Sequence, residues 1–520
     1  MKVIQFYSGV NSNFEEIFNE ALIDTFKADG HITVSDCSKT IMELENYLKD
    51  IGTECAVIEE DYIDSNFLDD YASYYVRNFS NGRKRCCRVH FFDERYLESD
   101  IRQMIANPER DCKISEHYLG YVVVRPLRKT IVGTTCLVSY KQKREARGWE
   151  PGRHYLAVCK KNVSFFGIPL EVECTPFQEQ DSNAAACATC ALWSAFNVTA
   201  SLFGTKVRSP SAITALAMAN SISLARKFPN GGLSFGDMLY TIRQMDLEPI
   251  VVGFGNVANR PIFLGNLYAY LNLGVPVIAI MRLKEKTRKR GFHAITINGY
   301  NIASTNDASI PLQALKIDQI YANDDQRVPG SRFKIEKLPN VEKFDLIPCR
   351  GSSVNVSQDS SRYIIDYLIV PIYHKIRVSY EEVWADAVIC DRGLRTKMME
   401  NIAHMTNGRI GVCSLLWDIK LVKSSDVKQE IRADMSFSED DRICFAVKSM
   451  PRFLWCLRIM YNGKLSTDVY LDATDSGQGL KVTARVFHNR EIQKLVYLIS
   501  SAEKAWMVRQ SAIFNALCQV

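Results

Sequence analysis

Two cysteines, a histidine and an acidic pair follow one another in an order that could support nucleophilic catalysis. Cys187 and Cys190 lie in the run Cys-Ala-Thr-Cys-Ala-Leu-Trp. His293 follows about a hundred residues later, and Asp324 and Asp325 come after it. The thiolate is the reactive form of cysteine, and an imidazole beside it can take the thiol proton. Since a carboxylate can hold that imidazole in the right tautomer, these residues predict acyl transfer at a thiol.

The cysteines stand at the start of an apolar stretch that predicts a buried helix over 187–203. A thiol in the first helical turn has its thiolate favoured by the helix dipole and by free backbone N–H groups. Cys187 is therefore the first choice for the nucleophile, and Cys190, one turn further inside, is the second. The side-chain amide of Gln180 could donate to the developing oxyanion together with the backbone N–H of the cysteine.

The histidine and the acidic pair each adjoin a strand-like run rich in β-branched and aromatic residues. His293 begins the run His-Ala-Ile-Thr-Ile-Asn-Gly-Tyr, and Asp324 follows the run Ile-Tyr-Ala-Asn that starts at Ile320. Two such strands could place the imidazole and a carboxylate opposite the cysteine helix. We expect Asp324 to orient the imidazole, with Asn323 and Asp325 as second choices.

Taken in order, these residues resemble the papain-like cysteine peptidases, nearest to the branch that processes bacteriocin leader peptides. In that branch Gln, often with Asp close behind, precedes the Cys and its apolar helix. A His-x-φ-x-φ-x-Gly-Tyr strand and a strand ending in Asp then follow. Gln180-Asp181, the Cys187 run, the His293 run and Asn323-Asp324 occupy these places within about residues 170–375.

The resemblance implies a papain-like α+β fold, with a helical half carrying Cys187 and an antiparallel β half carrying His293 and Asp324. It implies a thiol protease, a hydrolase that cleaves a peptide or isopeptide bond through a thioester, with Gln180 as oxyanion donor. A peptide or protein is then the expected substrate. The flanking regions resemble bacterial proteins that carry such a domain.

Changes of pattern predict three regions. An N-terminal α+β region spans 1–165, the papain-like domain spans 166–378, and a C-terminal mixed α/β region spans 379–520. In the last region we expect a helix beyond residue 380, strands at 443–447 and 451–459, and a long amphipathic helix over about 490–518. A helical block followed by a β block is typical of an α+β fold and not of alternating βαβ units.

Composition narrows the partners and the location. The chain has 520 residues, and its 64 Lys and Arg against 59 Asp and Glu give a net charge of +5, too small to predict a nucleic-acid partner. The 16 cysteines show no disulfide-scaffold spacing and the first ten residues lack a secretory signal, so we expect a reduced, cytoplasmic protein. Polar residues within the uncharged stretch 182–205 favour a buried helix over a membrane span. No nucleotide-binding or metal-binding fingerprint is present, so no cofactor or metal is expected.

Other interpretations of the same motifs stay open. Cys187 and Cys190 could belong to a zinc or redox motif, but no second Cys-x-x-Cys and no preceding strand support this. Ser234 stands in Gly-Leu-Ser-Phe-Gly, a nucleophile-elbow pattern, yet Asp237 three residues later indicates a helix cap. The basic run 284–290 could attract an acidic substrate or a nucleic-acid activator, or could be a solvated loop.

Two rival functions follow from the same residues. The thiol could pass its acyl group to an amine instead of water, as transglutaminase-like enzymes do. Alternatively, the domain could be a catalytically degenerate scaffold whose N- or C-terminal region binds a protein partner. Selective alkylation of one cysteine near neutral pH would separate a catalytic thiol from a structural one.

Overall fold

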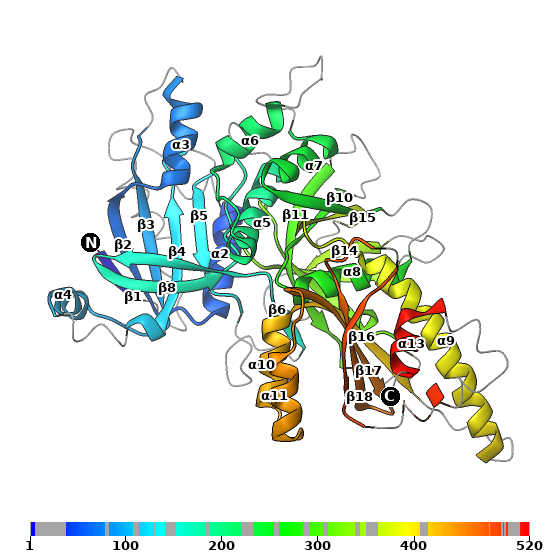
Figure 1. The fold of residues 1–520 in the computed structure, drawn as a ribbon. Helices are drawn as coiled ribbons and strands as arrows, with labels where there is room; N and C mark the ends of the chain where they lie inside the picture. Colours follow the sequence, from blue (N-terminus) through cyan, green and yellow to red (C-terminus); the bar gives the residue numbers. More distant parts are fainter. Residues whose placement is uncertain are drawn as a thin grey trace. The chain divides into compact units, whose positions relative to one another are not determined.

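A computed structural model gives the fold of the chain (Figure 1). It describes residues 2–5, 38–77, 83–107, 114–127, 130–140, 152–181, 187–219, 232–253, 259–283, 292–304, 310–337, 344–349, 362–405, 414–477, 479–489, 492, 494, 496, 497 and 510–518. These residues form a mixed α and β structure with several antiparallel sheets, which confirms the expected fold class at that level. The basic run 284–290 and most of the helix predicted over 490–518 lie outside the described residues.

The chain forms two compact units. Unit 1 comprises Met1–Asn256, Gly274–Asn301 and Asp318–Ile372, and unit 2 comprises Val257–Leu273, Ile302–Ile317 and Tyr373–Val520. The three-region division at residues 165 and 378 stays a prediction. Cys187, His293 and Asp324 all belong to unit 1.

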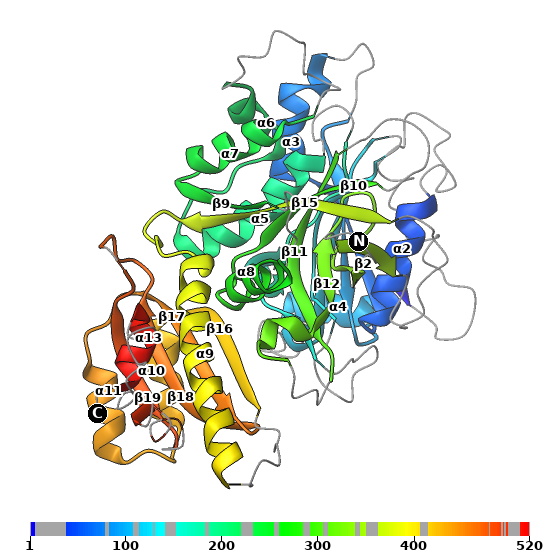
Figure 2. The same ribbon diagram turned by 90° about the vertical axis from the view of Figure 1, so that its right-hand side faces the viewer.

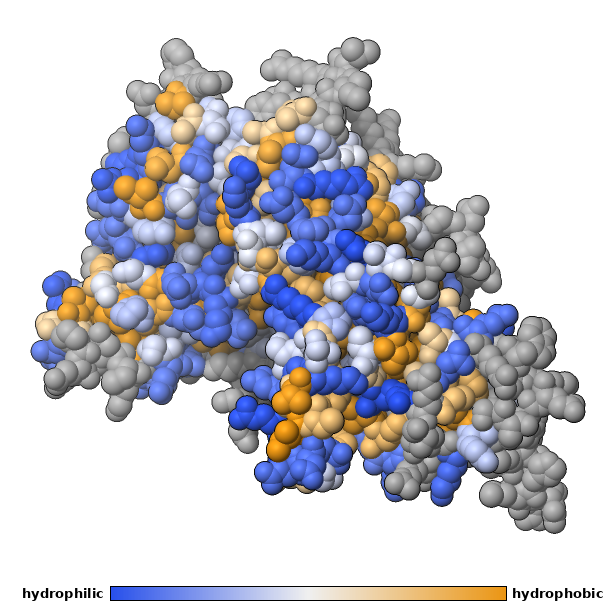
Figure 3. Space-filling view, in the orientation of Figure 1, coloured by the Kyte–Doolittle hydropathy of each residue, from blue (hydrophilic) through white to orange (hydrophobic). Residues whose placement is uncertain are grey.

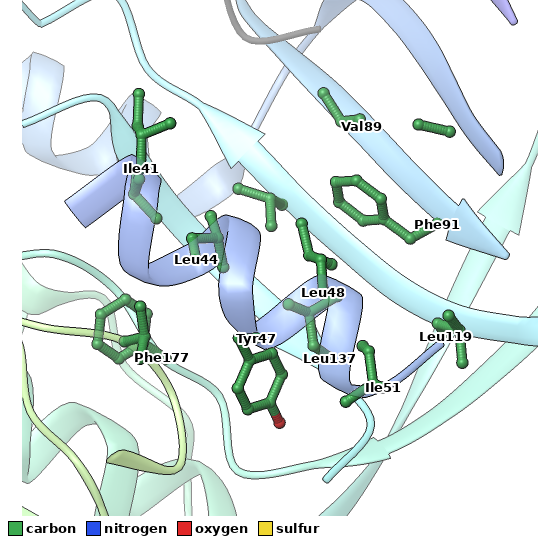
Figure 4. Packing of buried hydrophobic residues seen from close by; sticks show 14 of the residues in the cluster. Ile41, Leu44, Tyr47, Leu48, Ile51, Val89, Phe91, Leu119, Leu137 and Phe177 are labelled. Carbon is green, nitrogen blue, oxygen red and sulfur yellow. The ribbon is translucent and has the colours of Figure 1, made fainter. Parts of the chain in front are cut away.

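Unit 1 begins with a five-stranded antiparallel sheet that is covered on both faces. Its strands are β1 (Lys2–Gln5), β2 (Cys55–Tyr62), β3 (Cys86–Phe92), β4 (Tyr118–Val124) and β5 (Val132–Leu137). Because successive side chains of a strand point to opposite faces, Val89 and Phe91 of β3 meet helix α2 (Ser38–Asp50), as Figure 4 shows. Phe92 instead packs with the hairpin of β7 (Cys159–Phe165) and β8 (Ile168–Cys174). Helices α3 (Ser65–Ser73) and α4 (Glu98–Ala106), with the short 3-10 turns η2 (Tyr75–Arg77) and η4 (Ile114–His117), complete this part.

A second antiparallel sheet of unit 1 closes on itself. Its strands are β10 (Val277–Leu283), β11 (Phe292–Ile302), β12 (Ile317–Asn323), β13 (Ser331–Lys337), β14 (Phe344–Cys349) and β15 (Tyr363–Tyr373). Strand β10 pairs with β11 along one edge and with β15 along the other, so the six strands form a closed ring. Strand β6 (Arg153–Tyr155) adds to β11, and β9 (Leu247–Gly253) adds to β15. Closure pairs the backbone N–H and C=O groups of strands that would otherwise lie at open edges of the sheet.

Three helices pack against the closed sheet: α5 (Cys187–Phe203), α6 (Pro210–Ala219) and α7 (Phe235–Gln244) (Figure 2). Leu192, Trp193 and Phe196 of α5 are almost fully buried among residues of α6, α7, β10 and β15. The Thr296 hydroxyl of β11 also donates to the Ala191 carbonyl of α5 at 2.7 Å. An apolar helix buried in this way fixes the position of its first residue, Cys187.

Unit 2 is built around a four-stranded antiparallel sheet: β16 (Leu415–Lys423), β17 (Phe453–Tyr461), β18 (Lys464–Asp472) and β19 (Val482–Phe487). Helices α8 (Arg260–Asn272), α9 (Tyr380–Met405), α10 (Ser424–Ala433) and α13 (Ala512–Cys518), and the 3-10 turn η5 (Gln313–Lys316), belong to this unit. Leu454 and Cys456 of β17 pack toward α10, whereas Trp455 between them stacks edge-on against Tyr270 of α8. This alternation is the two-residue repeat of a strand.

The strand predicted at 443–447 is wrong, because these residues belong to helix α11 (Glu439–Val447). Ser438 caps this helix by accepting a hydrogen bond from the backbone N–H of Asp441 at 3.1 Å, and three acidic residues occupy the first turn. The cap and the acidic first turn favour a helix more strongly than the short apolar run that follows them favours a strand.

The described helices include none that is both long and apolar enough to cross a membrane. Figure 3 shows hydrophobic and hydrophilic residues intermixed over one face of the molecule. Residues 187–203 of the uncharged stretch form helix α5, which packs among the other elements of unit 1.

Candidate active site

Cys187 is the first residue of helix α5, as the sequence predicts, and its side chain is partly exposed. The backbone N–H groups of a first helical turn have no partner within the helix, and the helix dipole places partial positive charge there. A thiolate and an oxyanion are both favoured at such a position. Residues 182–186, which precede the helix, lie outside the described residues.

His293 lies near the start of β11, opposite Met281 of β10, and is only 7% exposed. Its Nε2 lies 2.8 Å from Asp324 Oδ1, a short hydrogen bond. Its Nδ1 is buried and forms no hydrogen bond of ordinary geometry within the described residues. The Cys187 thiol interacts with the imidazole and is one of the influences on the histidine pKa.

The pKa of His293 reflects opposing influences. Burial alone would lower it, but the charge and hydrogen bond of Asp324, the interaction with the Cys187 side chain and the charge of Asp325 together raise it well above the ordinary value. An imidazolium is thus stabilised at this position. An imidazole that holds its proton firmly, beside a thiol at a helix N-terminus, can form the thiolate–imidazolium pair used in thiol catalysis.

Asp324 comes directly after β12 and is almost fully buried. Burial would raise its pKa, but His293, the Arg327 guanidinium and the backbone N–H of Gln326 lower it below the ordinary value. The Gln326 N–H donates to Oδ1 at 3.1 Å, and Arg327 Nε lies 3.5 Å from Oδ2. Asp324 is therefore an ionised carboxylate held in place from three sides.

Arg327 is a residue of the site that sequence reasoning missed. Its side chain is buried, and besides Asp324 it approaches Glu43 Oε1 at 4.0 Å. It also lines a cavity of about 110 Å³ together with Glu43, Tyr140 and Arg332. The only signal in the sequence was its position three residues after Asp324. That spacing brings the two side chains together only because the chain turns between them.

Cys190, the second choice for the nucleophile, is buried one turn inside α5. Burial and the charge of Asp325 raise the pKa of the Cys190 thiol well above its ordinary value. The amide Nε2 of Gln178 donates to Cys190 Sγ at a long 4.0 Å. A protonated, enclosed thiol of this kind is a poor nucleophile.

Asn323 is not brought to the imidazole, because its side chain is used elsewhere. Its amide nitrogen donates to the carbonyls of Thr175 and Pro176 at 3.1 and 3.0 Å and to the Ser194 hydroxyl at 3.1 Å. Its oxygen accepts from the Gly330 N–H at 3.0 Å. Asn323 therefore ties the strand end to α5 and to the segment before it.

The backbone of Gln180 is hydrogen-bonded to the backbone of the acidic pair. Its N–H donates to the Asp325 carbonyl at 3.2 Å, and its side chain is partly exposed. The preceding residue, Glu179, fixes the segment by bonding Thr40 and the backbone of β5. The backbone of Gln180 thus lies next to the acidic pair, while residues 182–186 between Gln180 and Cys187 lie outside the described residues.

Asp325 lies on the same side of the imidazole as Asp324. Its Oδ1 is 3.7 Å from His293 Nε2, and the side chain is 4% exposed. Burial raises the pKa of Asp325 to about 7, against the lowering effect of His293. Together with His293 and Asp324 it forms a buried group whose ligand atoms lie within 4.8 Å of one another, so these three residues could hold a metal ion.

The serine alternative is not supported by the geometry. Ser234 caps helix α7: it accepts from the Asp237 N–H at 3.3 Å, while Asp237 Oδ2 accepts from the Ser234 N–H at 2.9 Å. This reciprocal arrangement is the capping box expected from the sequence. The Ser234 hydroxyl also donates to Asp237 at 2.6 Å, so it is engaged in local structure.

Neither a comparison with models of protein families nor one with curated proteins yields a match to this chain. The case for a function therefore rests on the side chains described above.

Proposed function

We propose that this protein is a cysteine-dependent hydrolase that cleaves a peptide or isopeptide bond through a thioester intermediate. The observation that carries the proposal is the convergence of Cys187, His293 and Asp324 from a helix start, a strand and a strand end. These three residues lie far apart in the sequence and belong to three different elements of the fold. A thiol, an imidazole and a buried carboxylate in this order form a catalytic triad.

In the first half of the reaction, His293 Nδ1 takes the proton of the Cys187 thiol. Nε2–H continues to donate to Asp324, whose negative charge stabilises the resulting imidazolium. The thiolate attacks the substrate carbonyl carbon, and the carbonyl oxygen becomes an oxyanion. The backbone N–H of Cys187 and the side-chain amide of Gln180 are the proposed donors to it.

The intermediate then collapses by breaking the carbon–nitrogen bond. His293 gives its proton to the departing amine, which leaves a thioester on Cys187. In the second half, His293 removes a proton from water as the water oxygen attacks the thioester carbon. The carbon–sulfur bond breaks, the carboxylic acid leaves, and the proton on His293 returns to the thiolate.

The arrangement of unit 1 supports a papain-like fold for the central domain. A helical part, α5 to α7, carries the cysteine at a helix start, and an antiparallel closed sheet, β10 to β15, carries the histidine and the aspartate. The same division into a helical and a β half is what the resemblance implies. We extend the proposal to a reduced, cytoplasmic protein acting on peptide or protein substrates, with the flanking regions available to a protein partner.

A test of the proposal compares variants of the two cysteines. The substrate is a small ester that needs no specific pocket. Incubation with a small nitrophenyl ester, followed by intact-mass measurement, should add one acyl group to the wild type and to Cys190→Ala. Cys187→Ala should add none. Acylation that persists in Cys187→Ala and disappears in Cys190→Ala would move the nucleophile, and acylation of both variants would reject the mechanism.

The acyl acceptor and the bond cleaved need a second experiment. A pool of denatured proteins is incubated with the wild type or with Cys187→Ala, with and without a primary amine in excess. New peptide termini that appear only with the wild type support hydrolysis, whereas products with the added mass of the amine support the transglutaminase-like alternative. If neither kind of product forms, the degenerate scaffold is favoured.

A further inference from the structure

The catalytic arrangement leaves the carboxyl group of Asp325 unexplained. It is 96% buried, and neither of its oxygens forms a hydrogen bond within the part of the chain that the structure describes. A buried carboxyl group without hydrogen bonds costs free energy, and such groups are rare outside functional sites. The triad itself needs only the oxygen of Asp324 that faces the imidazole.

The groups that face Asp325 are unbalanced in charge. His293 is the nearest group able to carry positive charge, while Asp324 and Glu179 both act on Asp325 as negative charges. Arg327 contacts Oδ2 of Asp324, the oxygen that does not face the imidazole. The charge of Asp325 also raises the pKa of the Cys190 thiol. Two carboxyl groups and one imidazole therefore share a buried space. Arg327 offsets the charge of Asp324 from its other oxygen, and a divalent cation between the three side chains would offset the charge of Asp325 as well.

The distances from the imidazole to the two carboxylates bracket the ligand spacing of a small tetrahedral ion, and the three ligand atoms lie within 4.8 Å of one another. With bonds of about 2.0 Å, two ligands of a tetrahedral zinc ion lie roughly 3.3 Å apart. The two distances from His293 Nε2 are 2.8 Å to Asp324 Oδ1 and 3.7 Å to Asp325 Oδ1, one on either side of that value. Small side-chain rotations of the two carboxyl groups would equalise them.

We infer that His293, Asp324 and Asp325 form a binding site for zinc or a closely related divalent transition-metal ion, and that the bound ion switches off the thiol site. One imidazole nitrogen and two carboxylate oxygens suit zinc, whereas magnesium and calcium prefer oxygen ligands throughout. The inference of a metal site stands on these three residues alone. The inhibitory role rests on the proposed function.

Binding of the ion exchanges one bond for another at the imidazole. The Nε2–H bond of His293 breaks, its proton passes to solvent, and a bond between Nε2 and the metal forms. Asp324 then binds the ion and no longer accepts from the imidazole. A metal-bound imidazole cannot become an imidazolium stabilised by Asp324, so it no longer draws the proton from Cys187.

The test measures metal binding in protein that cannot catalyse. Zinc binding to the Cys187→Ala variant is measured by calorimetry, alone and with Asp325→Asn or Asp318→Asn added. Asp318 lies on the same strand, β12, and its carboxylate accepts from Asn301, so it is a matched control for the substitution. Circular dichroism confirms that the variants are folded.

We expect Cys187→Ala to bind zinc as tightly as the wild type, Asp318→Asn to leave the affinity unchanged, and Asp325→Asn to lower it at least about tenfold. Equal affinity in the two Asp→Asn variants would overturn the inference, as would the absence of zinc binding. Binding that requires Cys187 would place the metal on the thiol–imidazole pair and would overturn it too.

The inhibitory role is tested with the wild type and the nitrophenyl ester. Zinc should slow acylation with an inhibition constant that matches the affinity measured in Cys187→Ala. If no acylation occurs even after a chelator is added, the proposed function fails while the calorimetric result still decides the metal site. If acylation occurs and bound zinc leaves its rate unchanged, the inhibitory role is wrong.

Discussion

Replacing Asp324 by asparagine removes the charge that stabilises the imidazolium while it keeps the size of the side chain and one acceptor oxygen. Two unit charges 2.8 Å apart interact by about 6 kcal/mol at an effective dielectric constant of about 20. Arg327, 3.5 Å from the other oxygen, already neutralises part of the carboxylate, so we take about half of this interaction as the loss. A loss of about 3 kcal/mol in the transition state lowers kcat/KM roughly a hundredfold.

The assay is the rate of acylation by the nitrophenyl ester, followed by the released nitrophenolate. Asp318→Asn is again the control, because it makes the same chemical change on the same strand away from the imidazole. Asp325→Asn should lose less than Asp324→Asn, since its nearest oxygen is 3.7 Å from Nε2 and not 2.8 Å. If folded Asp324→Asn and Asp318→Asn react at equal rates, the assignment of Asp324 as the orienting carboxylate is refuted.

Three further predictions concern stability. Asn323→Ala removes the hydrogen bonds that tie the strand end to α5 and should lower the free energy of urea unfolding by about 2 kcal/mol, whereas an unchanged value would deny this role. Burial lowers the pKa of His90 from 6.5 to about 4, so the unfolded chain binds the extra proton first and stability falls as the pH drops between these values. The maximal loss is about 3 kcal/mol, and urea unfolding of His90→Gln should depend less steeply on pH across that window. Gly265→Ala places a Cβ 2.0 Å from the Tyr380 ring and hydroxyl, so it should lower the thermal midpoint by overpacking, and a midpoint equal to that of the wild type would contradict this packing.

The elements that carry strong local patterns could be predicted from the sequence. The apolar stretch after Cys187 is helix α5 over the predicted residues, and the His293 run lies within strand β11. The Ser234 cap is confirmed as well, because its reciprocal hydrogen bonds involve only residues three apart. Local periodicity and capping are enough where neighbouring residues decide the structure.

Features that depend on distant pairing could not be predicted. The closure of the sheet rests on pairing between β10 and β15, about ninety residues apart, and the sequence holds no local signal for it. Asn323 and Asp324 were rival candidates because they are adjacent. In the structure the Asn323 side chain bonds the segment around Thr175, while Asp324 faces His293. The turn that brings Arg327 back onto Asp324 likewise becomes visible only in three dimensions.

The measurement that tests the central claim most directly is alkylation of the native protein with limiting iodoacetamide at pH 6 to 7, with the modified thiol mapped by mass spectrometry. The thiolate–imidazole pair predicts rapid, single labelling at Cys187, slowed strongly by His293→Ala, while the exposed Cys444 reacts slowly. Labelling of Cys187 no faster than that of Cys444, or unaffected by His293→Ala, would contradict the account.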